Sequence, residues 1–231
     1  MDSVARTRQR VMALFLPLSV ALLMIGEALT PKGLDQAIMK TSTALKVLPI
    51  ATKHPTQLYV SNALVIVGLG ALAVSFAAIA SLVRGRGSTF ATIAAVIGGF
   101  ASFFGAIANV LVGFNLAAAA RAHMTQEDAA RFLVTTFKSG VGNAFLLGYF
   151  FGLIVALIIM VIALWRSRCV PRWLPILFAV SLEVAFFAHA GIVAVPLMLP
   201  FAVAMLLLAS RIWRVAAVPT SHNPDPSGAP T

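Results

Sequence analysis

The stretch that decides the fold is residues 173–190, WLPILFAVSLEVAFFAHA, which is apolar along almost its whole length and yet carries one carboxylate. A helix of this length rises about 27 Å, close to the ~30 Å hydrocarbon core of a bilayer. Glu183 lies ten residues after Trp173, or about 15 Å along the helix, near the middle of the bilayer. Because placing a carboxylate there costs about 3 kcal/mol or more, we interpret Glu183 as a residue with a partner or a purpose.

The composition extends this interpretation to the whole chain. Its 231 residues are 60% hydrophobic and 10% charged, and the mean hydropathy is +0.97. The apolar residues come in long runs rather than at amphipathic spacing, and too few polar residues remain to coat a soluble globule. The sequence therefore predicts an all-α, polytopic integral membrane helix bundle.

Six transmembrane helices are predicted from the apolar runs. They are residues 11–29, 58–83, 89–120, 141–165, 173–190 and 195–213. The third run is too long for one straight crossing, so we expect it to tilt or to continue beyond the bilayer, with Gly98-Gly99 as a bend. The transmembrane domain, residues 11–214, lies between a basic cytoplasmic segment, residues 1–10, and a disordered cytoplasmic tail, residues 215–231.

The positive residues predict the orientation. If the N-terminus is inside, ten of the seventeen Lys and Arg residues lie in cytoplasmic segments and seven lie outside, which favours both termini inside. Trp165, Trp173 and Trp213 stand at the inner ends of their spans, as interfacial anchors do. The expected location is the plasma membrane of a cell, with multiple passes.

The first span has a second interpretation. Three arginines, an apolar run and then Gly26-Glu27-Ala28 are also typical of a secretory signal sequence. The run lacks a clear small-x-small cleavage motif, so a permanent helix is preferred. If it were removed, five spans would remain and the mature N-terminus would lie outside.

Several kinds of function are disfavoured. The net charge of +10 comes from short flanks between apolar runs, without a basic helix face, so no nucleic acid is expected as a partner. The single cysteine, Cys169, excludes an internal disulfide or a multi-cysteine metal site. No motif of a hydrolase, kinase or metalloenzyme is present, so no metal, cofactor or catalytic residue is predicted.

The two outer connectors are each predicted to form a short amphipathic helix. The first is expected from Leu34 to Leu48, ended by Pro49, with an interfacial face. That face comprises Leu34, Ile38, Thr41, Leu45 and Leu48. The second has Thr125 as N-cap and Asp128 completing a capping box, with Gly140 as its stop. Its face comprises Ala129, Phe132, Leu133, Thr136 and Phe137. We predict that both helices form a lid over the outer ends of the spans.

Small residues recur every four positions on two spans. The third span has Ala101, Gly105, Asn109 and Gly113, and the fourth has Gly148, Gly152 and Ala156. Such stripes let two helix backbones approach closely, so we expect these two stripes to meet. A homodimer seam is the alternative, and glycine and alanine are in any case common in membrane helices.

Four polar residues are predicted to form a ligand-binding or proton-linked site: Glu183, His189, Glu27 and Asn109. If they face inward they line an outward-facing cavity, although boundary residues such as Asn62 and Asn143 can equally cap helices or meet headgroups. Glu183 and His189 are six positions apart, about 240° around a helix, so they do not share a face. The candidate partners of Glu183 on other spans are Asn109, Ser75, Ser102 and Tyr149.

The connector between the fourth and fifth spans reads LWRSR at residues 164–168 and PRWLP at residues 171–175. With the hydropathy plan, it resembles uncharacterised six-helix integral membrane proteins of actinobacterial type. The resemblance implies location and topology and no catalytic residue.

The predicted function is binding or passage of a small or lipophilic molecule through an outward-facing polar pocket around Glu183. The alternatives are a structural or accessory subunit of a membrane complex and, third, an intramembrane enzyme. The expected partners are the lipid bilayer and a small lipophilic ligand, with a homo-oligomer or a larger complex as further alternatives.

Overall fold

The computed structural model describes residues 3–34, 40–121, 124–187 and 194–217. Within these ranges every regular element is helical, which confirms the all-α prediction. The elements are α1 (Ser3–Leu29), α2 (Thr41–Lys53), α3 (Pro55–Ala80), α4 (Ser88–Asn109), the π-helical turn η1 (Val110–Phe114), α5 (Asn115–Arg121), α6 (Gln126–Lys138), α7 (Gly140–Ser167), α8 (Trp173–Phe187) and α9 (Ala194–Ala217).

Five helical segments in the described part are long and apolar enough to cross a membrane. They are Val4–Leu29, Pro55–Ala80, Ser88–Ala120, Gly140–Ser167 and Val195–Ala217. The apolar part of α8 is shorter, at Trp173–Val184, and rises about 18 Å. The chain is therefore a multi-pass membrane protein, with five established long apolar helices and α8 as the sixth candidate.

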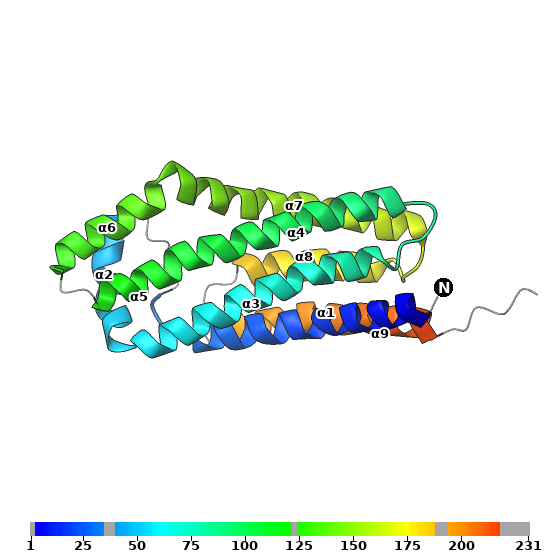
Figure 1. Ribbon diagram of the computed structural model, residues 1–231, viewed down its shortest axis with the longest axis horizontal. Helices are drawn as coiled ribbons and strands as arrows, with labels where there is room; N and C mark the ends of the chain where they lie inside the picture. The colour runs from blue at the N-terminus through cyan, green and yellow to red at the C-terminus, as the bar shows by residue number, and fades with distance from the viewer. Residues whose placement is uncertain (1–2, 35–39, 122–123, 188–193, 218–231) are drawn as a thin grey trace, which may run out of the picture.

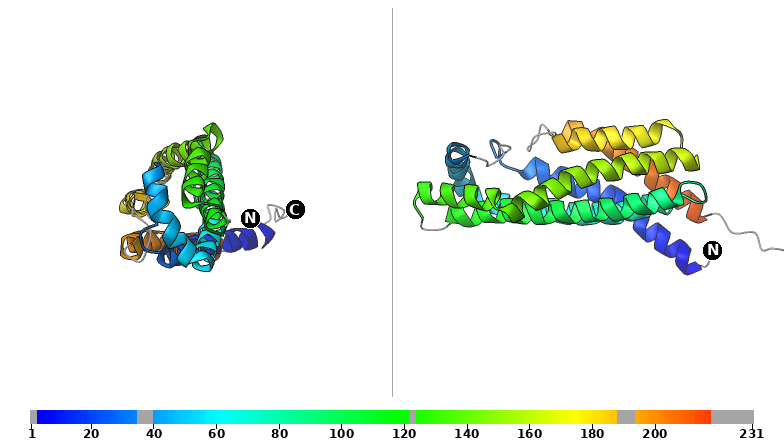
Figure 2. Two further views of the ribbon diagram at one scale, coloured as in Figure 1. Left: turned by 90° about the vertical axis from the view of Figure 1, so that its left-hand side faces the viewer. Right: turned by 90° about the horizontal axis from the view of Figure 1, so that it is seen from above.

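The long helices run side by side along the bundle (Figure 1). One end of the bundle, here called the arginine end, holds the start of α1, the α3–α4 turn, the α7–α8 turn and the end of α9. The guanidinium of Arg10 lies 5.6 Å from the ring centroid of Trp213, which joins α1 to α9 there. The other end, here called the cap, holds α2, α5 and α6 (Figures 1 and 2).

The two ends of the chain differ in detail from the prediction. Helix α1 includes most of the predicted basic segment, and its first turns project from the bundle (Figure 2). Pro17 lies inside α1, where it removes a backbone hydrogen bond and favours a kink. Helix α9 continues to Ala217, so the first three residues of the predicted tail, 215–217, are helical. Residues 218–231 lie outside the described ranges.

The irregularity of the third span is not where it was predicted. Helix α4 is continuous through Gly98-Gly99, and the π-helical turn follows at Val110–Phe114. The prediction of a bend at Gly98-Gly99 was wrong because Gly98 serves close packing: a Cβ there would lie 2.7 Å from the ring of Phe76. In the π-helical turn, a Cβ on Gly113 would collide with the side-chain amide of Asn62 on α3.

The small-residue stripes of α4 and α7 meet, as predicted. A Cβ on Gly152 would lie 3.0 Å from the Cβ of Ala101, and one on Gly148 would lie 2.7 Å from the ring of Phe104. On the α4 side, Gly105 receives the ring of Tyr149. The exception is Gly113, which faces α3 rather than α7. Close helix packing through small residues therefore holds the α4–α7 seam.

The main hydrophobic core joins α1, α3, α4, α7, α8 and α9. At its centre three aromatic rings come together from α3, α8 and α9. The ring centroids of Phe76 and Phe178 are 6.3 Å apart, and those of Phe178 and Phe201 are 6.1 Å apart. The hydroxyls of Ser19 and Ser75, 3.5 Å apart, link α1 to α3 within this core.

A second hydrophobic cluster forms the cap. It contains residues of α2, α5 and α6 together with Leu58 at the start of α3. Helix α2 lies across this end of the bundle (Figure 2). The cap therefore has a core of its own, separate from the core between the long helices.

The predicted boundaries and face of α2 were partly wrong. The helix continues through Pro49 to Lys53, and Leu45 is 38% exposed. The buried face comprises Ala44, Val47, Leu48 and Ala51. This face packs against residues of α5 and α6, which include Ala117, Ala129 and Ala130. The predicted face residue Ile38 lies outside the described residues.

The predicted start of α6 is confirmed. The hydroxyl oxygen of Thr125 accepts a hydrogen bond from the backbone N–H of Asp128 at 3.2 Å. Phe132 is 45% exposed, so its place on the packed face was wrong. Gly140 begins α7 rather than ending α6, because the Ser139 hydroxyl accepts from the N–H of Gly142 at 3.2 Å and caps α7.

Candidate functional site

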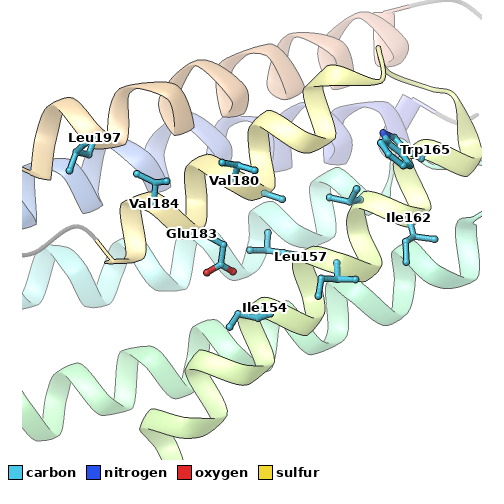
Figure 3. Close-up of a pocket in the computed structure, with 11 residues that line it drawn as sticks. Ile154, Leu157, Ile162, Trp165, Val180, Glu183, Val184 and Leu197 are labelled. Atoms are coloured by element: carbon cyan, nitrogen blue, oxygen red, sulfur yellow. The ribbon is translucent and has the colours of Figure 1, made fainter.

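The side chain of Glu183 lines a groove between α7 and α8. The groove has a volume of about 760 Å³ and is lined by Ile154, Leu157, Ile158, Val161, Ile162, Trp165, Ala179, Val180, Glu183, Val184 and Leu197. Figure 3 shows the Glu183 side chain pointing from α8 toward the α7 wall of the groove. Glu183 is half-buried and is the single charged group among otherwise apolar lining residues.

The groove runs along the helix axis and opens on the side of the bundle. Its α7 wall extends from Ile154 to Trp165, about 16 Å of helix. Ile158 and Val180, on opposite walls, are each 56% exposed. In a membrane these exposed side chains face lipid, so the groove is accessible from the bilayer.

Glu27 and Asn109 meet in a second cavity, between α1, α3, α4, α7, α8 and α9. Its volume is about 240 Å³. Leu23, Leu146, Tyr149 and Leu182 are among its other lining residues. The side-chain amide of Asn109 donates to the carbonyl oxygen of Gly105 at 2.9 Å, which fixes its orientation on α4. This interior cavity is more polar than the groove, because it brings a carboxyl, an amide and a phenol together.

Helices α7 and α8 line both the groove and the interior cavity. Tyr149 of α7 lines the interior cavity. Leu182 lines the interior cavity, while its neighbour Glu183 lines the groove. The groove and the cavity are therefore adjacent, on either side of this part of α8.

The structure divides the four predicted site residues. Glu27 and Asn109 are brought together, Glu183 lies apart in the groove, and His189 lies outside the described residues. Three of the candidate partners of Glu183, namely Asn109, Ser75 and Ser102, donate hydrogen bonds within their own helices. Ser75 donates to the carbonyl of Ala71 at 2.9 Å, and Ser102 donates to that of Gly98 at 2.8 Å.

The two boundary asparagines are also placed. The amide of Asn62 donates to the carbonyl of Leu58 at 2.8 Å, so it bonds to its own helix while covering Gly113. Asn143 is exposed in the first turn of α7. Neither residue lines the groove or the interior cavity.

Most of the chain matches the model of a known family. A model of the DUF4386 family, described as a domain of unknown function, matches residues 11–217. The chain belongs to the DUF4386 family. This confirms the predicted membership of an uncharacterised family, while the actinobacterial type and the six-helix count stay predictions. No curated protein and no solved structure matches the chain.

The DUF4386 match includes every residue that lines the groove and the interior cavity. Both spaces are thus built within the family domain. The match carries no assigned activity, so any role for these residues is argued from their chemistry.

Sequence reasoning missed two features of this DUF4386 domain. It identified Glu183 but not the apolar groove around it, since the apolar residues of α7 surround the helix and mark no particular face. It also treated the arginines of the α3–α4 and α7–α8 turns only as a topology signal. The close spacing of Arg166, Arg168 and Arg172 was the available clue.

In the groove and the interior cavity of this DUF4386 domain, the ionisable side chains are the carboxyl groups of Glu27 and Glu183 and the phenol of Tyr149. In the described part of the chain, no three His, Cys, Asp or Glu residues come together as metal ligands. Cys169 is half-buried, with its sulfur 3.0 Å from the Ser167 hydroxyl. The carboxyl groups of Glu27 and Glu183 are therefore the principal reactive groups that the described cavities contain.

Proposed function

We propose that this DUF4386 protein binds a small lipophilic molecule in the α7–α8 groove, without catalysing a reaction, and that Glu183 anchors the polar group of the ligand. The observation that carries the proposal is a carboxyl group opening into an otherwise apolar groove of about 760 Å³. Ligand sites in proteins commonly have this size and this combination of apolar walls with few polar groups.

The groove favours a ligand that is mostly hydrocarbon and carries one hydrogen-bonding or cationic group. The other side chains that line the groove are apolar except for the indole of Trp165, whose N–H is already bonded to the carbonyl oxygen of Arg172. A polar group in hydrocarbon is costly without a partner, so a ligand that supplies one is favoured. The lateral opening favours entry from the bilayer rather than from water.

The proposal includes an orientation. Six spans with both termini inside place the arginine end in the cytoplasm and the cap, with α2 and α6, outside the cell membrane. Passage of a ligand would require a route from the groove to the interior cavity. Binding alone requires only the groove, so binding is the primary proposal.

A groove-filling substitution tests binding. Val180→Trp fills the groove, while Val67→Trp adds the same ring on α3, where Val67 is 57% exposed against 56% for Val180. The probe is hexadecanol bearing a diazirine, applied to the purified protein in nanodiscs, with labelled peptides mapped by mass spectrometry. We expect Val180→Trp to lower labelling of α7 and α8 about tenfold, as loss of about 1.4 kcal/mol of binding would, and Val67→Trp to leave it unchanged.

Equal labelling of α7 and α8 in both variants would contradict ligand binding in the groove. The structural alternative predicts a different pattern. If the groove holds a helix of a partner subunit, Val180→Trp would release that subunit from the purified complex, while probe labelling of α7 and α8 would not fall.

A further inference from the structure

Four arginines surround a second open pocket, at the arginine end of the bundle. This arginine pocket has a volume of about 610 Å³ and is lined by Arg86, Trp165, Arg166, Ser167, Arg168 and Arg172. All four arginines are exposed, so their guanidinium groups are available to a ligand. Arg86 comes from the α3–α4 turn, and the other three come from the end of α7 and the α7–α8 turn, which are far from it in sequence.

The fold brings these two turns into contact. Gly87 has a φ of 101°, and a Cβ there would lie 2.8 Å from the carbonyl oxygen of Ala163 on α7. Only glycine permits both this conformation and this close approach. The contact places Arg86 beside the last turn of α7. On the other side of the pocket, the indole N–H of Trp165 donates to the carbonyl of Arg172 at 3.0 Å.

Backbone geometry also positions Arg168. It is the C-cap of α7 and has a φ of 52°, a left-handed conformation that is uncommon for residues other than glycine. Arg166 packs over the ring of Phe90, with its guanidinium carbon 5.3 Å from the ring centroid. The backbone segments that carry these arginines are thus held by specific contacts.

These charges have no acidic partner within the described residues. The carboxylates there are Glu27, Glu127, Asp128 and Glu183, and the ion pair found among them is Glu127 with Arg131 on α6, at the cap. Four guanidinium groups at one pocket repel one another, and an anion relieves that repulsion. Guanidinium groups bind phosphate oxygens through paired hydrogen bonds.

We infer that the arginine pocket binds the phosphate headgroup of an anionic phospholipid. Trp165 lines both the arginine pocket and the apolar groove, so a headgroup on the arginines is continuous with a surface for its acyl chain. This continuity favours a lipid over free phosphate. Basic pockets between membrane helices at the cytoplasmic surface recognise such headgroups. The inference goes beyond the proposed function, because it does not depend on Glu183.

The test compares two double variants with equal loss of charge. Arg86→Gln with Arg172→Gln changes the pocket, and Arg211→Gln with Arg214→Gln removes two exposed arginines of α9 at the same end. Native mass spectrometry in a neutral detergent measures binding of phosphatidylglycerol and phosphatidylcholine with identical acyl chains. We expect the wild type and the α9 variant to prefer phosphatidylglycerol, and the pocket variant to lose that preference about tenfold or more.

An equal loss of the phosphatidylglycerol preference in both double variants would overturn the inference, since it would show that the lipid responds to the total positive charge of this end rather than to the pocket. Displacement of phosphatidylglycerol by inorganic phosphate would also overturn it, in favour of a soluble anion. If the pocket double variant does not fold, Arg168→Gly is tested in its place. Glycine adopts the left-handed backbone conformation without strain, and the substitution removes one charge from the pocket. The preference for phosphatidylglycerol over phosphatidylcholine should then fall several-fold. An unchanged preference would contradict binding in the arginine pocket. Glu183→Gln should leave this lipid preference unchanged, so the groove proposal and the arginine-pocket proposal can be contradicted independently.

Discussion

Helix α7 packs in opposite ways on its two sides. Toward α4 it presents Gly148 and Gly152, and the backbones approach until Gly152 meets Ala101. Toward α8 it presents large branched side chains, including Ile158 and Ile162, and the two helices leave a groove of about 760 Å³. Helix α7 therefore has a closed seam, against α4, and an open seam, against α8.

The difference follows from side-chain size. In a bilayer, hydrocarbon chains solvate leucine and isoleucine well, so burial of those side chains gives little drive for helix association. Small residues permit van der Waals contact between backbones, which does hold helices together. The small residues of the closed seam therefore hold α4 against α7, whereas the large side chains of the open seam leave the groove between α7 and α8.

The largest expected effect comes from forcing the closed seam apart. Gly152→Leu places a side chain where even a Cβ lies 3.0 Å from Ala101, and overpacking of this kind costs about 1–3 kcal/mol. Gly99→Leu is the matched control, because a Cβ at Gly99 has no atom within 4 Å. Thermal unfolding in detergent should show a lower midpoint for Gly152→Leu only. Equal midpoints for the two variants would show that the seam does not hold the bundle.

A smaller loss of stability is expected from removing the N-cap of α7, which lies outside both the closed seam and the open seam. Ser139→Ala removes the hydroxyl that accepts from the N–H of Gly142 at 3.2 Å, and loss of such a cap costs about 1 kcal/mol. Ser139→Asp retains an acceptor and should restore the unfolding midpoint. Labelling of the groove by the diazirine alcohol should be the same in both variants, since the cap lies outside the groove. A labelling change as large as that of Val180→Trp would contradict the separation of fold and site.

The sequence predicted those parts of the fold that depend on neighbouring residues. The apolar runs indicated the long helices, Thr125 and Asp128 indicated the start of α6, and the glycine spacing indicated the α4–α7 seam. Each is a local pattern with a direct physical meaning, such as span length, backbone capping or close approach.

Features that depend on distances between helices were not predictable. The groove exists because of how far α7 lies from α8, and no residue of either helix determines that distance alone. The buried face of α2 was missed because Ala44 and Ala51 are buried by their packing against α5 and α6, and small residues such as these give little signal in a hydrophobic pattern. The predicted site is divided in the structure for the same reason. The prediction grouped Glu27 and Glu183 by their expected depth in the membrane, but the positions of their helices place them in two different spaces.

Substitution of Glu183 should have the smallest effect on the fold and should identify its role most clearly. Glu183→Gln retains the shape of the side chain and removes the charge at the open seam. Glu27→Gln makes the same change in the interior cavity and is the control. Both variants should unfold within about 0.5 kcal/mol of the wild type, as most substitutions away from packed features do.

The most direct test of the central claim compares two diazirine probes of equal chain length, hexadecylamine and hexadecanol, on the wild type and these two variants. A charge-assisted hydrogen bond contributes about 1.5–3 kcal/mol, so Glu183→Gln should lower amine labelling of α7 and α8 about tenfold or more and alcohol labelling by less. Glu27→Gln should change neither. Amine labelling that is unchanged by Glu183→Gln, or lowered equally by Glu27→Gln, would contradict the assignment of Glu183 as the anchor of a ligand in the groove.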